Sequence, residues 1–331
     1  MLFFNSMVMS TLITISSYTW FSMWIGLEIN LLSIIPLFKS HKNTYPVEAT
    51  LKYFITQALA SAIILFIVIT TMNLMEYTPN NFNYWLMMIM NSALLTKLGA
   101  APFHNWLPEV MEGLNWMNNL ILLTWQKLAP MILIMYNLNM LFFLSIIIII
   151  SSIVSGIFGM NQMSLRKIMA YSSINHIAWM LSSMMNLNSI WMIYFSIYTL
   201  ISINIIIIFH YMNSFFIPQL FLILNSNKLI KLMFMFNFFS LGGLPPFLGF
   251  YPKWLTINNL IENDMYWLSL ILILFTLMTL FYYIRIMFPS LTLNFQESLI
   301  KLPHLTKFKI IKWNMITLMG LIISVDIFHY L

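Results

Sequence analysis

Apolar stretches of about 20 residues recur along the whole chain, and this pattern constrains the fold more than any other feature. A helix needs about 20 mainly apolar residues to cross the hydrocarbon core of a bilayer. Of the 331 residues, 61% are hydrophobic and only 7% are charged, whereas soluble domains carry about a quarter charged residues. The sequence therefore predicts an all-α polytopic membrane protein, built as a single membrane domain over residues 1–331.

Hydropathy predicts about eleven transmembrane helices, two of them broken. The predicted spans are residues 3–20, 22–39, 48–71, 83–115 (broken), 117–136, 139–160, 167–184, 189–211, 229–262 (broken), 266–288 and 312–329. The N-terminal residues lack the basic segment and the small-residue cleavage site of a signal peptide. Residues 3–20 are therefore interpreted as the first span.

The basic loop residues alternate from one side of the predicted membrane to the other. Even-numbered loops contain Lys39, Lys42, Arg166, Lys167, Lys228, Lys231, Lys301, Lys307, Lys309 and Lys312, and odd-numbered loops contain no Lys or Arg. Positive loops remain on the inner side of a membrane. We therefore expect the N-terminus on the inner side and the C-terminus outside. Because the lysines are scattered among loops, the net charge of +6 does not indicate a nucleic-acid partner.

The segment LLTKLGAAPFHNWLPEV, residues 94–110, places Lys97 in an apolar helix pattern, which continues through Gly99 and is predicted to be interrupted at Pro102. Pro102 has no N–H to donate to the carbonyl of Leu98, which leaves a free acceptor at membrane depth. An ionisable group beside unwound backbone is typical of ion-handling sites in transporters. The alternative for Lys97 is a snorkelling lysine with its ammonium group at the surface.

A weak internal repeat relates the two predicted breaks. The sequence KLGAAPF at residues 97–103 aligns with LGGLPPF at residues 241–247. The breaks fall in spans four and nine, which are five positions apart in the order of spans. Because five is odd, the two broken helices are predicted to run in opposite directions. This indicates inverted five-helix repeats, approximately residues 1–138 and 139–290, with span 312–329 appended.

Three more charged residues within predicted spans are candidates for a functional role. Glu28 lies in WIGLEIN, where a lone carboxylate is costly and favours a functional role over an interfacial position near a helix end. Lys127 lies in TWQKLAP near the middle of a span, where inserting a lysine costs roughly 2.5–3.5 kcal/mol. Lys253 follows the second break in GFYPKW. We predict that Glu28, Lys97, Lys127 and Lys253 handle protons.

Prolines near these lysines are expected to free backbone carbonyls. Pro130 would free the carbonyl of Gln126, beside Lys127. Pro245 and Pro246 would free those of Leu241 and Gly242 in the second break. Proline is common in membrane helices, so its presence near a lysine does not by itself define an ion site.

Two histidines and one arginine complete the candidates. His104 follows the first break and is a candidate proton relay, with interhelical hydrogen bonding as the alternative. For His176 the interhelical hydrogen-bonding role is favoured. Arg285 lies late in its span and is interpreted as a snorkelling residue.

A line of titratable groups across an apolar slab suggests a mechanism. Burial favours the neutral form of a lysine, and a nearby carboxylate favours the charged form. If Glu28 approaches and leaves Lys97, that lysine alternately holds and releases a proton. The proton could then pass through water and side chains to Lys127 and on to Lys253.

The chain has no cysteine, which excludes disulfides, thiolate-bound iron–sulfur clusters and Cys-ligated zinc. No nucleotide-binding or hydrolase motif is present either. We therefore expect no cofactor and no metal in this chain.

The segments WIGLEIN, LLTKLGAAPFHNWLPEV, TWQKLAP and SLGGLPPFLGFYPKW occur in this order over nearly the whole chain. Together they resemble the chain 2 family of antiporter-like subunits of respiratory NADH:ubiquinone oxidoreductase (complex I), in its mitochondrially encoded form. Within that family the residues matching Glu28, Lys97, Lys127 and Lys253 are the proposed proton-handling groups. Animal members lack three helices of their fourteen-span bacterial relatives, which fits eleven spans and an N-terminus on the matrix side.

The resemblance implies a proton-translocating membrane-arm subunit of the mitochondrial inner membrane, belonging to an oxidoreductase whose NADH, flavin, clusters and ubiquinone are bound by other subunits. The implied partners are other membrane-arm subunits and membrane lipids. Two alternatives remain open at this point. One is a secondary antiporter that exchanges sodium or potassium for protons, and the other is a structural subunit whose charges only fix helix packing, although apolar packing would serve that purpose at lower cost.

Overall fold

The computed structural model describes residues 1–39, 44–77, 84–138, 140–224 and 228–292. Over these residues the chain forms helices and no strand, apart from one isolated antiparallel bridge between Ser164 and Phe216. The predicted all-α class is thus confirmed for this part of the chain. The predicted span 312–329, together with Lys42 and the lysines of the tenth loop, lies outside the described residues.

The helices follow one another with short connections. They are α1 (Leu2–Ser16), α2 (Trp20–Phe38), α3 (Tyr45–Tyr77), α4 (Tyr84–Leu98), α5 (Trp106–Gly113), α6 (Trp116–Leu123), α7 (Trp125–Met135), α8 (Leu141–Met160), α9 (Leu165–Met184), α10 (Asn188–Met212), α11 (Ile217–Leu224), α12 (Lys228–Gly242), α13 (Phe250–Glu262) and α14 (Tyr266–Thr292).

Five of the described helices are by themselves long and apolar enough to cross a membrane: α2, α8, α10, and the greater parts of α3 and α14. The predicted number of about eleven spans remains a prediction.

One difference from the prediction concerns residues 117–136, which the sequence predicts as one helix. The chain breaks there at Thr124, between α6 and α7. The Thr124 hydroxyl donates to the carbonyl of Leu120 at 2.7 Å, a bond that bends helices.

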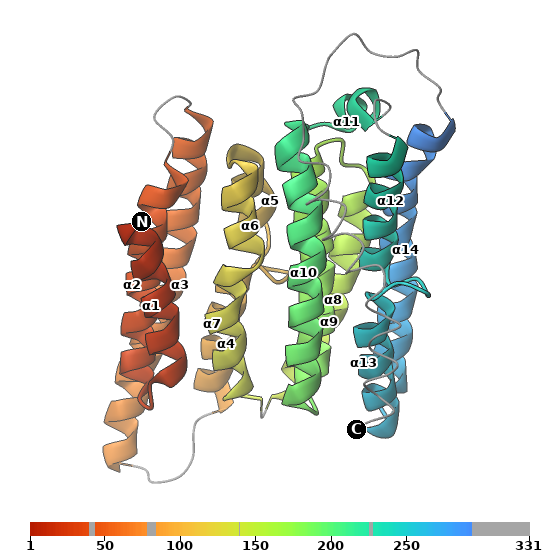
Figure 1. Ribbon diagram of the computed structural model, residues 1–331. Coiled ribbons are helices and arrows are strands. Elements are labelled where there is room, and N and C mark those ends of the chain that lie inside the picture. The colour runs from red at the N-terminus through yellow and green to blue at the C-terminus, as the bar shows by residue number, and fades with distance from the viewer. Residues whose placement is uncertain (40–43, 78–83, 139, 225–227, 293–331) are drawn as a thin grey trace. The chain divides into compact units, whose positions relative to one another are not determined.

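The chain divides into two compact units, Met1–Ile147 and Ile148–Leu331. The first unit contains α1 to α7, in red to yellow in Figure 1. Within it α3 packs against α2, α4 and α5, and α7 packs against α4 and α1. Helices α1 and α2 approach closely at Gly26, where an added Cβ would lie 2.4 Å from Thr14 Cγ2. Small residues permit such close packing of membrane helices.

Helix α9 forms the centre of the second unit. Every residue from Ser172 to Met184 is buried, as expected for a helix with neighbours on all sides. Helices α10, α13 and α14 pack against it. The buried hydroxyl groups of α9 have hydrogen-bond partners within the helix. They donate to carbonyls of the preceding turn, from Ser172, Ser173, Ser182 and Ser183.

Helix α4 ends in a Schellman motif. Gly99 has a left-handed φ of 76°, which glycine adopts without steric cost. The N–H of Gly99 donates to the carbonyl of Thr96 at 3.2 Å, and that of Ala100 donates to the carbonyl of Leu95 at 3.1 Å. These two bonds define the motif.

Helix α12 ends in the same way. Gly243 has a φ of 75°. Its N–H donates to the carbonyl of Ser240 at 3.0 Å, and the N–H of Leu244 donates to the carbonyl of Phe239 at 3.2 Å. A left-handed glycine therefore ends each helix before the chain reaches Pro102 or Pro246. The prediction that Pro102 itself interrupts the first helix is corrected in this respect.

Candidate functional site

Lys97 lies in the last turn of α4, within the Schellman motif, and is only 8% exposed. Side chains from two other elements bond to carbonyls in this turn. Gln57 Nε2 on α3 donates to the carbonyl of Lys97 at 3.4 Å, and Trp106 Nε1 on α5 donates to that of Thr96 at 3.0 Å. The last carbonyls of a helix have no partner within it, so these contacts stabilise the break in which Lys97 is buried.

Glu28 on α2 is half-buried, and its charge acts electrostatically on Lys97. The structure therefore brings together the two residues whose proximity the sequence left open. They are not in ion-pair contact, because the ion pairs found among the described residues join Lys52 to Glu48 and Glu109. Glu28 Oε2 is buried and has no hydrogen-bond partner. A buried acceptor without a partner is costly, and the functional role of Glu28 stays a prediction.

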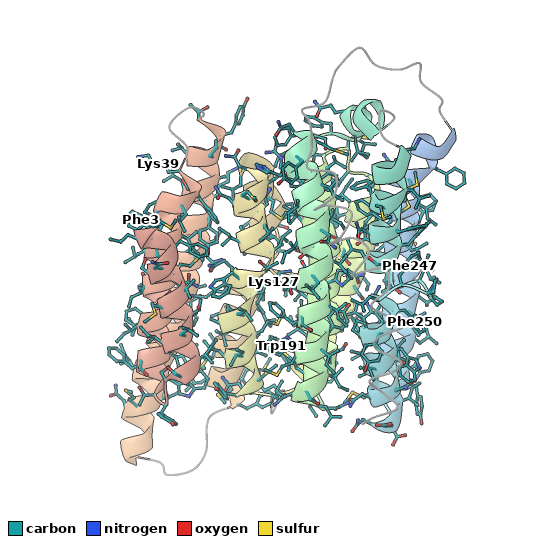
Figure 2. The ribbon with its side chains drawn as sticks, viewed as in Figure 1. Phe3, Lys39, Lys127, Trp191, Phe247 and Phe250 are labelled. Atoms are coloured by element: carbon teal, nitrogen blue, oxygen red, sulfur yellow. The ribbon has the colours of Figure 1, made fainter. Side chains whose placement is uncertain are left out.

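Lys127 lies in the first turn of α7 and is 2% exposed. Figure 2 shows it close to the point where α6 and α7 meet. Its backbone N–H donates to the carbonyl of Thr124, the residue at the break, at 3.3 Å. The lysine is thus buried as predicted, beside a helix interruption that the sequence did not indicate.

Two amide side chains that were not predicted are paired near Lys97. Asn30 Nδ2 on α2 donates to Gln126 Oε1 on α7 at 3.1 Å, and Gln126 Nε2 donates to Asn30 Oδ1 at 3.2 Å. A small cavity of about 20 Å³ adjoins this pair and Lys97. The one available signal was the presence of amide side chains in otherwise apolar spans.

Lys253, in the first turn of α13, is 6% exposed and belongs to the second unit. Its Nζ donates to the carbonyls of Leu241 at 3.3 Å and Gly242 at 2.9 Å. The sequence predicts that these two carbonyls are free. An added Cβ on Gly243 would lie 2.7 Å from Lys253 Cδ. The left-handed glycine therefore also provides the space that the lysine side chain occupies.

Trp179 of the central helix α9 adjoins this lysine, and His176 lies one turn earlier on the same helix. Lys253 Nζ lies 5.7 Å from the ring centroid of Trp179, a distance compatible with a cation–π interaction. One turn earlier, His176 Nδ1 shares a hydrogen bond of 2.9 Å with the hydroxyl of Tyr194 on α10. His176 therefore makes the interhelical contact that the sequence favours for it.

The remaining candidates make local or structural contacts. His104, 9% exposed, uses Nδ1 to hydrogen-bond the carbonyl of Pro102 at 3.3 Å. Arg285 on α14 donates from Nη1 to the carbonyl of Met160, the last residue of α8, and from Nη2 to Met163 Sδ. A cation at a helix C-terminus is favourable, so Arg285 holds the end of α8.

Lys52 is a lysine within a predicted span that the sequence interpretation overlooked. Its Nζ lies 3.1 Å from Glu48 Oε1 and 2.9 Å from Glu109 Oε2, and its side chain is 43% exposed. It ties α3 to α5 at the surface and contrasts with the three buried lysines. In the described part of the chain, no group of three or more His, Asp or Glu residues is arranged to hold a metal ion.

Comparison with known proteins defines first the class and then the family. Residues 17–279 match the family described as NADH:quinone oxidoreductase/Mrp antiporter, TM. The fold is also that of a chain in respiratory complex I from Thermus thermophilus with bound aureothin, with a TM-score of 0.86 at 21% identity over 96% of this chain and 77% of that one. The class is thus that of antiporter-type membrane subunits.

Two curated relatives narrow this class. The chain is 48% identical over 298 residues to NADH-ubiquinone oxidoreductase chain 2 of Anopheles gambiae, covering 90% of this chain and 87% of that protein. It is 48% identical over 329 residues to chain 2 of Aedes aegypti, covering 97% and 96%. The chain belongs to the NADH-ubiquinone oxidoreductase chain 2 family.

Proposed function

We propose that this chain is a core membrane-arm subunit of respiratory complex I. It moves protons from the matrix to the intermembrane space, driven by electron transfer from NADH to ubiquinone in other subunits. The observation that carries the proposal is that three lysines, 8%, 2% and 6% exposed, each lie within one turn of a helix interruption. A buried ammonium beside open backbone can be stabilised when charged and still release its proton when its surroundings change.

Lys97, Lys127 and Lys253 are the proposed proton-holding groups. Glu28 acts on Lys97 through its charge, so a change in their separation changes how readily Lys97 holds a proton. Lys127 would accept that proton within the first unit, and Lys253 would hold a proton at the break of the second. His104, beside the first break, remains a candidate relay.

The two broken helices are proposed to be equivalent elements of inverted repeats, approximately residues 1–138 and 139–290. Their matching Schellman motifs support this equivalence, because Gly99 corresponds to Gly243 and both adopt the left-handed conformation. In transporters with inverted repeats, broken helices of this kind provide the ion sites.

The alternation of basic loops supports an N-terminus on the matrix side and a C-terminus on the intermembrane-space side. The mosquito relatives support a mitochondrial inner-membrane location. Other membrane-arm subunits and lipids are the proposed partners. NADH, flavin, iron–sulfur clusters and ubiquinone are proposed to be bound elsewhere in the complex, with no redox centre in this chain.

Native gel electrophoresis of solubilised inner membranes tests the assignment. This chain should migrate in the band that oxidises NADH, and its absence from that band would overturn the assignment.

A cation–proton antiporter is the second candidate, because the matching family includes Mrp antiporters. That function predicts sodium- or potassium-dependent proton flux in liposomes containing this chain alone. Membership of complex I predicts none.

A further inference from the structure

The Asn30–Gln126 pair joins the two helices that carry Glu28 and Lys127. Asn30 follows Glu28 by two positions on α2, and Gln126 directly precedes Lys127 on α7. Each amide donates to the other, at 3.1 and 3.2 Å. This reciprocal pairing uses one N–H and one acceptor site of each carboxamide and leaves each with further hydrogen-bonding capacity.

The cavity beside the pair has the size and polarity of a water site. Its volume is about 20 Å³, and a volume of roughly 10–15 Å³ or more on this measure is enough for one water molecule. The polar residues lining it are Asn30, Tyr53, Gln57, Lys97 and Gln126. A buried water typically makes about three hydrogen bonds, and these side chains can supply them.

An amide pair is a costly way to hold α2 against α7 if packing is its only role. Apolar side chains of similar volume would provide that contact without the cost of burying one amide fully and the other partly. Tyr53 OH also donates to Gln126 Oε1, at 3.5 Å, so the pair belongs to a polar network that includes the cavity. A carboxamide does not take up or release protons near neutral pH, and it can therefore orient a water molecule without itself storing the proton.

We propose that the Asn30–Gln126 pair positions one water molecule against Lys97 and thereby sets the rate at which this lysine passes its proton toward Lys127. The inference rests on the proposed function. Protonated Lys97 gives a proton to the water, and the water passes one of its own protons on through hydrogen bonds toward neutral Lys127. The water is regenerated, Lys97 becomes neutral and Lys127 becomes charged.

The test uses assembled complex I reconstituted in proteoliposomes, with NADH-driven proton pumping as the readout. Gln126→Met and Asn30→Leu keep the side-chain volume and remove the pairing. Each should slow pumping about threefold to tenfold, the effect of losing one to two neutral hydrogen bonds at the transfer step. The ratio of rates in H₂O and D₂O should rise, because proton transfer becomes limiting.

Two further variants separate positioning from packing. The double variant Asn30→Gln with Gln126→Asn exchanges the side-chain lengths, can form the pair again, and should recover most of the pumping rate. Asn118→Leu is the matched control. Asn118 Nδ2 donates to the carbonyl of Leu37 at 3.2 Å and so also links α6 to α2, without lining the cavity. It should pump at the wild-type rate.

Normal pumping with an unchanged isotope ratio in both single variants would overturn the proposed water-positioning role of the pair. So would slower pumping that leaves the isotope ratio unchanged and is not recovered by the exchanged pair. Failure of both single variants to assemble would also contradict it, because packing would then be their role. Lys127→Met, measured in parallel, separates the two proposals. Wild-type pumping in Lys127→Met would overturn the proposed function. Loss of pumping in Lys127→Met together with normal pumping in Gln126→Met would overturn only the water-positioning role of the pair.

Discussion

Lys253 Nζ lies 2.9 Å from the carbonyl oxygen of Gly242, the residue at which α12 ends. The last carbonyls of a helix lack intrahelical partners and carry the negative end of its dipole. The lysine therefore occupies a position where the broken helix itself stabilises a positive charge. Its second bond, to Leu241, extends the same arrangement by one residue.

Gly243→Ala should disturb this arrangement. The added Cβ would lie 2.7 Å from Lys253 Cδ, and the alanine would have to adopt the left-handed φ of 75° that Gly243 has. Alanine in the left-handed conformation costs roughly 1–2 kcal/mol. We expect lower thermal stability of the complex and slower NADH-driven proton pumping, measured by thermal inactivation and by acidification inside proteoliposomes.

Gly242→Ala provides the control from the neighbouring position. Its added Cβ would meet Leu280 Cδ1 at 3.5 Å, an ordinary contact, and its φ is not left-handed. Pumping should stay at the wild-type rate. Equal losses in both variants would contradict the account, since only Gly243 provides space for Lys253.

Lys97→Met and Lys52→Met should have very different rates of proton pumping, although both remove one lysine from the first unit. Lys97 is 8% exposed and feels the charge of Glu28, whereas the Lys52 side chain is 43% exposed and pairs at the surface. We expect Lys97→Met to slow pumping at least roughly tenfold, as for loss of a proton-transfer group. Lys52→Met should pump normally, because exposed ion pairs contribute little. Similar rates in the two variants would argue that burial of Lys97 has no role.

Arg285→Met should affect stability without affecting pumping. The guanidinium bonds to the carbonyl of Met160 and to Met163 Sδ, and hydrogen bonds of charged groups contribute about 1.5–3 kcal/mol. Thermal inactivation should occur at lower temperature, with a wild-type pumping rate per assembled complex. Slower pumping at unchanged stability would show that Arg285 belongs to the proton-handling set.

Much of the fold follows from local properties of the sequence. Apolar runs predict the long helices, and KLGAAPF and LGGLPPF predict a helix end in each segment, which the structure places at Gly99 and Gly243. At the second break the sequence even predicts which carbonyls are free, and Lys253 bonds to those of Leu241 and Gly242. These predictions succeed because each depends on a few neighbouring residues and on backbone chemistry.

Contacts between distant residues could not be predicted in this way. Asn30 and Gln126 are 96 positions apart, and each alone is an unremarked amide in an apolar span. The Thr124 break also escaped prediction, because threonine is common in membrane helices and only its bond to Leu120 reveals the bend. The proximity of Glu28 to Lys97 likewise depends on how α2 and α4 pack within the first unit.

The central claim is that buried lysines beside helix breaks carry protons, and Lys127→Met tests it most directly. Lys127 is 2% exposed, and methionine fills nearly the same volume without a titratable group. NADH-driven proton pumping by assembled, reconstituted complex should fall at least roughly tenfold. Oxidation of NADH by an artificial acceptor at the peripheral arm should remain unchanged. Normal assembly with wild-type pumping in this variant would contradict the account.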